Sequence, residues 1–211
     1  SSQIAYMTSS SPTGPFTYQG VALPQPPDNY GNNNHHTFFT FQGDWYCVYH
    51  NRYQAGIDGV STTEHRNICL DRMYYNPDGT IQQIIPTQDG LSQLANLNPF
   101  ERVEGETLNA QSGVDAEVCS EGGMNLTSIS DGDWIRVRGV DFLTGANAFQ
   151  ARVASGSDGG SIELRLDSID GPLAGTCVVG NTGGDQTWTT AVCAVSGVSG
   201  VHDLYLRFTG S

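Results

Sequence analysis

The chain has 211 residues and a formal net charge of −13, with 22 acidic residues against 9 basic ones. All of the basic residues are arginines, and such an acidic balance disfavours a nucleic acid as partner. No stretch approaches the roughly 20 apolar residues of a membrane-spanning helix, so no membrane partner is expected. The N-terminus also lacks the basic-then-apolar pattern of a signal peptide.

The first part of the chain contains short aromatic and β-branched runs that predict strands. They lie at residues 4–8, 37–41, 45–49 and 68–75, and turn-forming Gly, Pro, Asn and Asp separate them. Four or five such strands cannot close a sheet, and their rhythm is typical of fewer than two blades of a β-propeller. We therefore expect an incomplete propeller over residues 1–90, with its other blades upstream.

Residues 91–100 show no strand alternation and are predicted to form a linker. After it, residues 101–211 alternate apolar and polar side chains in about eight runs, most clearly at 161–167 and 203–208. This pattern predicts an antiparallel β-sandwich of jelly-roll type, so the fold class is all-β throughout. The acidity is concentrated here, because residues 91–211 carry 15 acidic and 6 basic side chains.

Five cysteines are present, so at least one has no partner within the chain. Cys177 and Cys193 lie in two short runs joined by a Gly-rich turn, and a β-hairpin would bring them together as a disulfide. Such a bond favours an oxidising, extracellular compartment. Cys47 and Cys69 either face one another across neighbouring strands or are two ordinary buried thiols.

A series of motifs runs in order through residues 1–90. It comprises IAYMTS (4–9), PTGPF (12–16), NHHT (34–37), GDWY (43–46), YHN (49–51), HRNIC (65–69) and YNPDGTI (75–81). The series resembles the last blades of a glycoside hydrolase family 43 catalytic domain, most closely the arabinoxylan arabinofuranohydrolase branch. The resemblance implies a five-bladed propeller and inverting hydrolysis, with catalytic carboxylates in earlier blades.

A second series covers residues 101–211. It comprises VEGE (103–106), QSG (111–113), DGDW (131–134), RVAS (152–155), GSIELRLD (160–167), TWTT (187–190) and HDLY (202–205). It resembles a carbohydrate-binding module of family 6, whose last strand would lie beyond Ser211. Together the two resemblances imply part of a secreted enzyme that removes arabinofuranosyl or xylosyl groups from arabinoxylan or a related hemicellulose.

No catalytic residue is expected within the chain, which alone should be inactive. Inverting glycosidases hold two carboxyl groups about 6.5 to 9.5 Å apart. The acids of the first part lie mostly in loops and tight turns, where Asp is favoured for its backbone hydrogen bonds. We therefore reject them as a catalytic pair: Asp28, Asp44, Asp58, Glu64, Asp71, Asp78 and Asp89.

One wall of the substrate site is expected to remain. The resemblance places a histidine at the propeller axis, near a metal ion or a catalytic acid, and His35 or His36 matches it. Strand alternation puts the two on opposite faces, which favours His35, on the side of Thr37. The alternative is that both histidines only cap a strand. Arg66 matches an arginine that reaches the innermost sugar, and His50 is expected only to end its strand.

The module is expected to bind glycans weakly at its loop end. Family 6 modules hold a sugar there between two aromatic rings, but Ser128 and Asp185 occupy the matching positions. Trp188 is predicted to be a core residue. A second cleft, on a sheet face, could use Tyr205 or Phe149, although either could also be core.

Calcium is the expected cofactor. Glu104 and Glu106, two apart on one predicted strand face, match residues that bind a structural calcium in the family, and carboxylate oxygens suit this ion. An exposed strand face with two glutamates would also need no ion. The alternative for the whole chain is a stand-alone carbohydrate-binding or structural module without catalysis.

Overall fold

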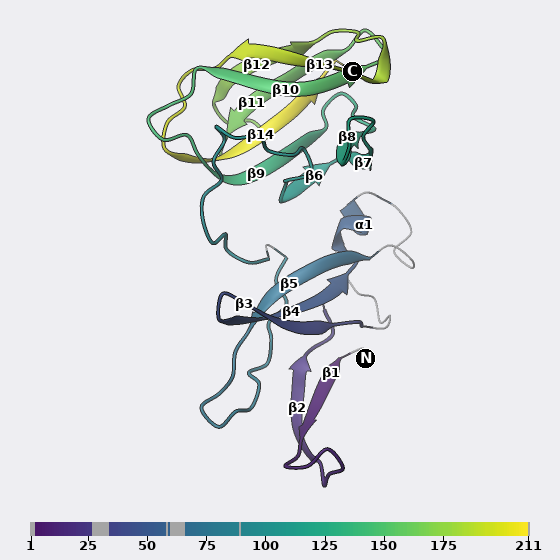
Figure 1. Ribbon diagram of the computed structural model, residues 1–211, viewed down its shortest axis with the longest axis vertical. Helices are drawn as coiled ribbons and strands as arrows, with labels where there is room; N and C mark the ends of the chain where they lie inside the picture. The colour runs from purple at the N-terminus through teal and green to yellow at the C-terminus, as the bar shows by residue number, and fades with distance from the viewer. Residues whose placement is uncertain (1–2, 27–33, 58, 60–65, 89, 211) are drawn as a thin grey trace. The chain divides into compact units, whose positions relative to one another are not determined.

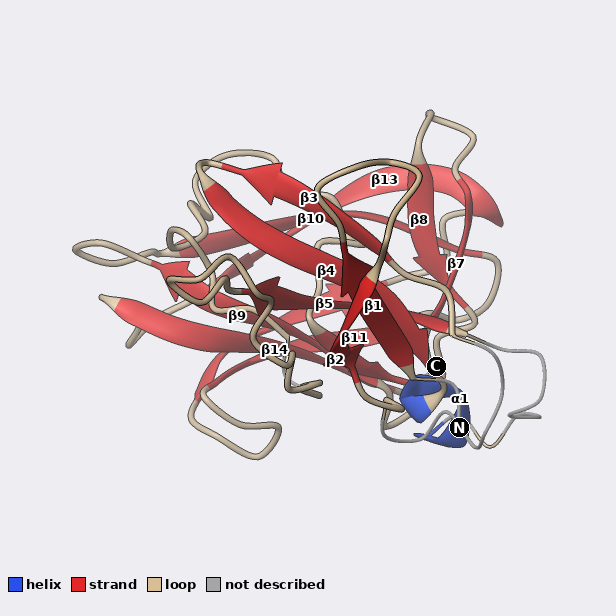
Figure 2. Cartoon of the chain, turned by 90° about the horizontal axis from the view of Figure 1, so that it is seen from below, coloured by secondary structure: helices blue, strands red, loops and turns tan. Residues whose placement is uncertain are grey.

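The computed structural model describes residues 3–26, 34–57, 59, 66–88 and 90–210. It divides into two compact units, Ser1–Ser92 and Gln93–Ser211. Strands dominate both units, and α1 (Tyr53–Ile57) is the single helix in the part that is described (Figure 2). None of the described helical structure is long and apolar enough to cross a membrane. The fold is therefore all-β, as the sequence predicts.

The described part of the first unit contains two antiparallel sheets. β1 (Ile4–Thr8) pairs with β2 (Thr17–Leu23), while β3 (Thr37–Phe41), β4 (Asp44–Asn51) and β5 (Asn67–Met73) form a meander in the order β3-β4-β5 (Figure 1). The bounds predicted for β1 and β3 are confirmed, whereas β2 was not predicted.

The core of the first unit lies on one face of the β3-β4-β5 sheet. Cys47 and Tyr49 alternate along β4 onto this face, where they pack with Leu23, Met73 and Ile84. Burying a side chain of this size contributes about 1.5 to 3 kcal/mol. The β1–β2 sheet joins the cluster through Leu23, so one core links both sheets.

The second unit is a sandwich of two sheets. The larger sheet has the strand order β12-β11-β14-β9-β6, and the smaller one pairs β10 with β13. The strands are β6 (Ala110–Ser112), β9 (Trp134–Asp141), β10 (Ala148–Ser155), β11 (Gly160–Leu166), β12 (Leu173–Val179), β13 (Gly184–Ala194) and β14 (Val201–Thr209). A separate hairpin is formed by β7 (Asp115–Val118) and β8 (Met124–Thr127).

Alternating side chains fill the space between these sheets. Ile162, Leu164 and Leu166 of β11 are buried, as their spacing predicts, and they pack within two apolar clusters. Phe149 of β10 packs against both clusters, so it is a core residue and unsuited to a surface cleft.

The predicted hairpin around Cys177 and Cys193 is wrong. β12, which carries Cys177, pairs with β11, whereas β13, which carries Cys193, pairs with β10 in the other sheet. The connection crosses between sheets because Thr182 pairs with the end of β10: its N–H donates to the Ser155 carbonyl at 2.8 Å. Both cysteines are thiols in this structure, and they meet across the sandwich.

The boundary between the units falls between Ser92 and Gln93. Most of the segment expected as a linker, residues 91–100, is bound to the second unit's sheet. Leu97 forms a parallel bridge to Val140, and its N–H donates to the Gly139 carbonyl at 2.9 Å. Its side chain also packs against the core.

Candidate functional site

The candidate residues of the first unit gather at one end of the β3-β4-β5 sheet. His35 and His36 directly precede β3, His50 lies near the end of β4, and Arg66 directly precedes β5. Because neighbouring strands run antiparallel, the start of β3, the end of β4 and the start of β5 share one edge. The topology thus brings together three positions that are far apart in the sequence.

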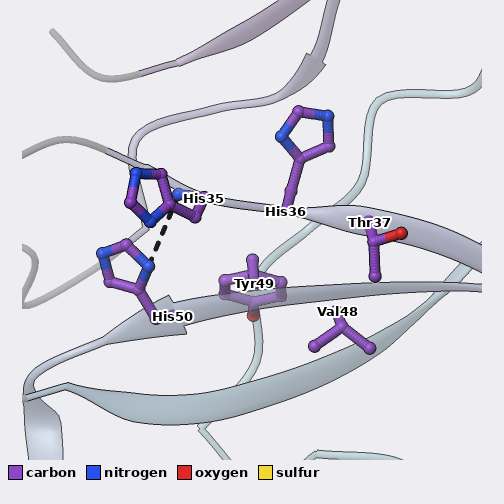
Figure 3. Close-up of a pocket in the computed structure, with 6 residues that line it drawn as sticks. All are labelled: His35, His36, Thr37, Val48, Tyr49 and His50. Carbon is purple, nitrogen blue, oxygen red and sulfur yellow. Dashed lines mark hydrogen bonds between the residues drawn. The ribbon is translucent and has the colours of Figure 1, made fainter.

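An open hollow of about 260 Å³ lies at this end of the sheet (Figure 3). Its described lining consists of His35, His36, Thr37, Val48, Tyr49 and His50, none of which is a carboxylate. Arg66 is exposed and lies at the same sheet end, but it does not line the hollow. The hollow can therefore contact a ligand through imidazole rings and the hydroxyl of Thr37.

His50 positions His35. The His35 backbone N–H donates to Nδ1 of His50 at 3.4 Å, and the two rings meet edge to face with centroids 5.7 Å apart. Because Nδ1 accepts this bond, a neutral His50 carries its proton on Nε2. His50 is only 6% exposed. It therefore does more than end its strand, a role that the isolated motif YHN did not indicate.

His36 projects away from the His35–His50 pair, as Figure 3 shows. Its ring contacts Phe38 at a centroid distance of 5.2 Å, on the sheet face opposite to Thr37. Burial lowers the pKa of His36, so its imidazole is neutral at neutral pH. The predicted placement of the two histidines on opposite faces agrees with this arrangement.

The described acids of the first unit each have a structural partner. Asp44 forms an ion pair with Arg72 at the other end of the sheet, and Asp78 Oδ1 accepts the Thr80 N–H at 2.9 Å within a turn. The remaining acids that we rejected lie outside the described residues: Asp28, Asp58, Glu64 and Asp89. Asp44 thus stabilises the sheet through an ion pair, and Asp78 stabilises a turn.

Asp71 is the buried carboxylate of this unit, at 5% exposure. It accepts hydrogen bonds from the Tyr49 hydroxyl and, at 2.6 Å, from the Thr87 hydroxyl. Burial raises the pKa of Tyr49, and the hydrogen bond and charge of Asp71 raise it further. Burial, with a smaller contribution from Asp71, also raises the pKa of Cys47 to about 12. Asp71 fastens the segment after β5 to the sheet.

Glu104 and Glu106 lie in a turn before β6, so the predicted strand face is wrong. The turn is closed by the Thr107 N–H, which donates to the Glu104 carbonyl at 3.0 Å. Glu106 Oε2 is buried without a hydrogen-bond partner, which suits a hard cation. Glu104 instead pairs with Arg102 at 3.0 Å, and no group of three metal-binding side chains occurs in the described ranges. Glu106 fits a calcium ion, whereas Glu104 fits only after leaving Arg102.

Polar groups occupy the loop end of the sandwich. Asp185 Oδ1 accepts the Gly156 N–H at 2.8 Å, and Ser128 has a left-handed backbone with φ of +58°. Trp188 is not a core residue, because Ala191 and Cys193 define the core-facing side of β13. Its indole Nε1 donates to the Ser120 hydroxyl at 3.1 Å on the outer side.

The outer face of the five-stranded sheet carries an aromatic pair. Trp134 on β9 and Tyr205 on β14 lie with ring centroids 5.7 Å apart. Arg136 lies directly opposite Tyr205 in the strand register, and its buried Nε makes no hydrogen bond within the described part of the chain. Arg165, the next neighbour, is paired with Glu163 at 2.9 Å. Rings and guanidinium groups thus lie side by side on this face.

Two family models match the chain. Residues 104–211 match the carbohydrate binding module of family 6, and residues 1–81 match the glycosyl hydrolases of family 43. The chain belongs to family 6 of the carbohydrate binding modules, and its first part matches family 43 of the glycosyl hydrolases. The hollow lies within the family 43 part, and the aromatic pair lies within the family 6 module.

Similar proteins match either the whole chain or the module alone. The arabinoxylan arabinofuranohydrolase of Paenibacillus polymyxa is 41% identical, over 99% of this chain and 34% of its own length. A solved family 43 arabinoxylan arabinofuranohydrolase from Bacillus subtilis, in complex with cellotetraose, has 44% identity and a TM-score of 0.87, over 100% of this chain and 45% of that one. A family 6 module from Clostridium cellulolyticum, in complex with xylose, is 50% identical over 55% of this chain and 89% of its own, with a TM-score of 0.54.

The chain therefore spans between a third and a half of the length of these hydrolases. The fold and both family assignments expected from the motifs are confirmed. The predicted roles of His35, His36, Arg66, Glu104 and Glu106 remain predictions.

Proposed function

We propose that the chain is the C-terminal part of a secreted, inverting glycosidase that removes arabinofuranosyl groups from arabinoxylan. The observation that carries the proposal is the convergence of His35, His36, His50 and Arg66 on one end of the β3-β4-β5 sheet, in a part that matches family 43. The name of the Paenibacillus relative supports arabinoxylan as substrate.

In this proposal the chain binds the sugar but does not break the bond. The described lining of the hollow offers no carboxylate, and inverting hydrolysis requires two of them, about 6.5 to 9.5 Å apart. The catalytic pair would come from upstream blades of the same protein. His35, held by His50, would face the propeller axis and any ion there, and Arg66 would donate to two sugar hydroxyls.

The module would add a glycan-binding surface on its outer sheet face. Trp134 and Tyr205 offer apolar ring surface, and the guanidinium of Arg136 lies beside them. The loop end is a poorer candidate, because Ser128 and Asp185 supply no ring. Neutral hemicellulose chains, which alternate apolar ring faces and hydroxyl groups, fit such a surface.

A structural calcium ion would be held at the turn before β6. The buried Oε2 of Glu106 supports this, because it has no hydrogen-bond partner among the described residues. A calcium ion would be a positively charged partner for this oxygen. Glu104 would be its second ligand after separating from Arg102. The ion would fix the turn and so position the first strand of the module.

The alternative is a stand-alone carbohydrate-binding or structural module without catalysis, and the aromatic pair on the sheet face favours the binding version. Affinity electrophoresis of the chain in gels with soluble arabinoxylan tests glycan binding. We expect clear retardation relative to a gel without polysaccharide. If arabinoxylan in the gel did not slow the chain, the module would have only a structural role.

A further inference from the structure

Two cysteine side chains meet in the core of the second unit, from strands of different sheets. Cys177 of β12 has no exposed surface, and Cys193 of β13 is partly buried. The two thiols are close enough for Cys193 to raise the pKa of Cys177. Both belong to the cluster that contains Ile162 and Phe208, so the contact joins the two layers of the sandwich.

The backbones of β12 and β13 approach closely beside this contact. The Ser196 N–H donates to the Ala174 carbonyl at 2.9 Å. A Cβ atom at Gly175 would lie 2.6 Å from the Ala194 carbonyl oxygen, so only glycine fits there. A disulfide requires Cα atoms roughly 4.4 to 6.8 Å apart. Strands held this near to one another can meet that requirement without rearranging the core.

We propose that Cys177 and Cys193 are oxidised to a disulfide that fastens the two sheets of the module together, and that the bond forms before the core closes. The oxidant is a small-molecule disulfide. One cysteine thiolate attacks it and releases a first thiol; the second cysteine then attacks the mixed disulfide and releases a second thiol. Two thiol protons leave, and the oxidant takes up the two electrons.

The order of events follows from burial. In the folded, reduced module, burial and the neighbouring Cys193 raise the pKa of Cys177 to about 12, so its thiol is not ionised at neutral pH. A thiol attacks only as the thiolate, and no surface of Cys177 is open to an oxidant. A bond made during folding is therefore retained, whereas a pair buried in the reduced state stays reduced.

The bond would enclose residues 178–192, the connection that crosses between the sheets. Closing a loop of this length restricts the unfolded chain and raises the ratio of folded to unfolded molecules by on the order of a hundredfold. Cys119 provides a matched control, because it lies in the turn between β7 and β8, where its N–H donates to the Gly123 carbonyl.

The test is to unfold the whole chain in denaturant and refold it with oxidised glutathione or with dithiothreitol. Free thiols are then alkylated and the protein is digested without reduction for mass spectrometry. We expect a peptide that joins Cys177 to Cys193 after oxidative refolding, unchanged in Cys119→Ser. The thermal midpoint should be several degrees higher than after reductive refolding, and Cys177→Ala/Cys193→Ala should remove this difference.

The timing is tested on reductively refolded chain that is transferred to oxidised glutathione without denaturant. We expect little crosslink until denaturant is added. Equally fast crosslinking of the folded chain would overturn the proposed order, and alkylation of both cysteines after oxidative refolding would overturn the disulfide itself.

Discussion

The two units are built from the same antiparallel strands but place their polar side chains differently. In the first unit, imidazole groups lie at strand ends around an open hollow, and Arg66 lies at the same end of the sheet. In the second unit, polar side chains at the strand ends bind the backbone, as Asp185 does. The aromatic rings of Trp134 and Tyr205 lie on a sheet face instead. An edge site depends on neighbouring segments to complete it, whereas a face site is complete within one sheet.

The comparison also concerns stability. Among its described residues, the first unit relies on one apolar cluster and on the buried Asp71, which ties β4 to the segment after β5. The second unit has two clusters between its sheets. We therefore expect single polar substitutions to affect the first unit more than the second.

The largest effect is expected for Asp71→Ala. The change leaves the buried hydroxyl of Tyr49 and the N–H of Thr87 without an acceptor, so the free energy of unfolding should fall by about 3 kcal/mol. Hydrogen exchange of β4 and β5, followed by mass spectrometry in increasing urea, measures this. Asp78→Ala, in an exposed turn, should cost far less, because water can replace its hydrogen bonds; equal losses in the two variants would contradict the importance of burial at Asp71.

Calcium should stabilise the second unit through Glu106. With free calcium at about one hundred times its dissociation constant, the gain is about 2.7 kcal/mol, and Glu106→Gln should abolish it. Thermal unfolding with calcium and with a chelator gives the measurement, with Glu101→Gln as the control on an exposed side chain. A midpoint that calcium does not change in the unsubstituted chain would exclude the ion.

Alkaline pH should destabilise the first unit through its buried thiols. The pKa of Cys47 is about 12 in the folded state, against 9.0 as the ordinary value, so its stabilising contribution is complete below pH 9 and is lost between pH 9 and 12. Each such thiol lowers the folding equilibrium constant by up to about tenfold per pH unit in this range. The slope of the unfolding free energy against pH in this range counts the protons released on unfolding, and Cys47→Ala should lower that count by one. An unchanged slope would contradict the raised pKa of Cys47.

The smallest effect is expected on glycan binding. Tyr205→Ala removes one ring of the aromatic pair and should weaken retardation in arabinoxylan gels about fivefold, because stacking contributes on the order of 1 kcal/mol. Val178→Ala, an exposed change on β12 of the same sheet, should leave retardation unchanged. If Ser128→Ala weakened binding instead, the site would lie at the loop end.

Local patterns in the sequence were sufficient for the strands but not for their partners. The runs at 4–8 and 37–41 gave the bounds of β1 and β3, because alternation and turn residues act over a few neighbours. They could not show that β12 and β13 enter different sheets, since this depends on Thr182 binding Ser155 of a distant strand. β2 was missed because polar Thr17 and Gln19 and the left-handed Gly20 interrupt its apolar pattern.

The candidate site was predicted in a similar way. Motifs identified His35, His36 and Arg66, and the register then placed them at one sheet end. The role of His50 depends on a bond to the His35 backbone, which no motif encodes. Trp188 was misassigned because its outer position depends on the register with β10, in which Arg152 donates to the Trp188 carbonyl.

The most direct test of the central claim is hydrolysis of an aryl arabinofuranoside by the purified chain. The account predicts no release of the aryl group above the buffer blank, because the hollow proposed to bind the sugar has no carboxylate among its described lining residues. Release that depends on enzyme concentration, and that Asp44→Asn or Asp71→Asn abolishes, would contradict it.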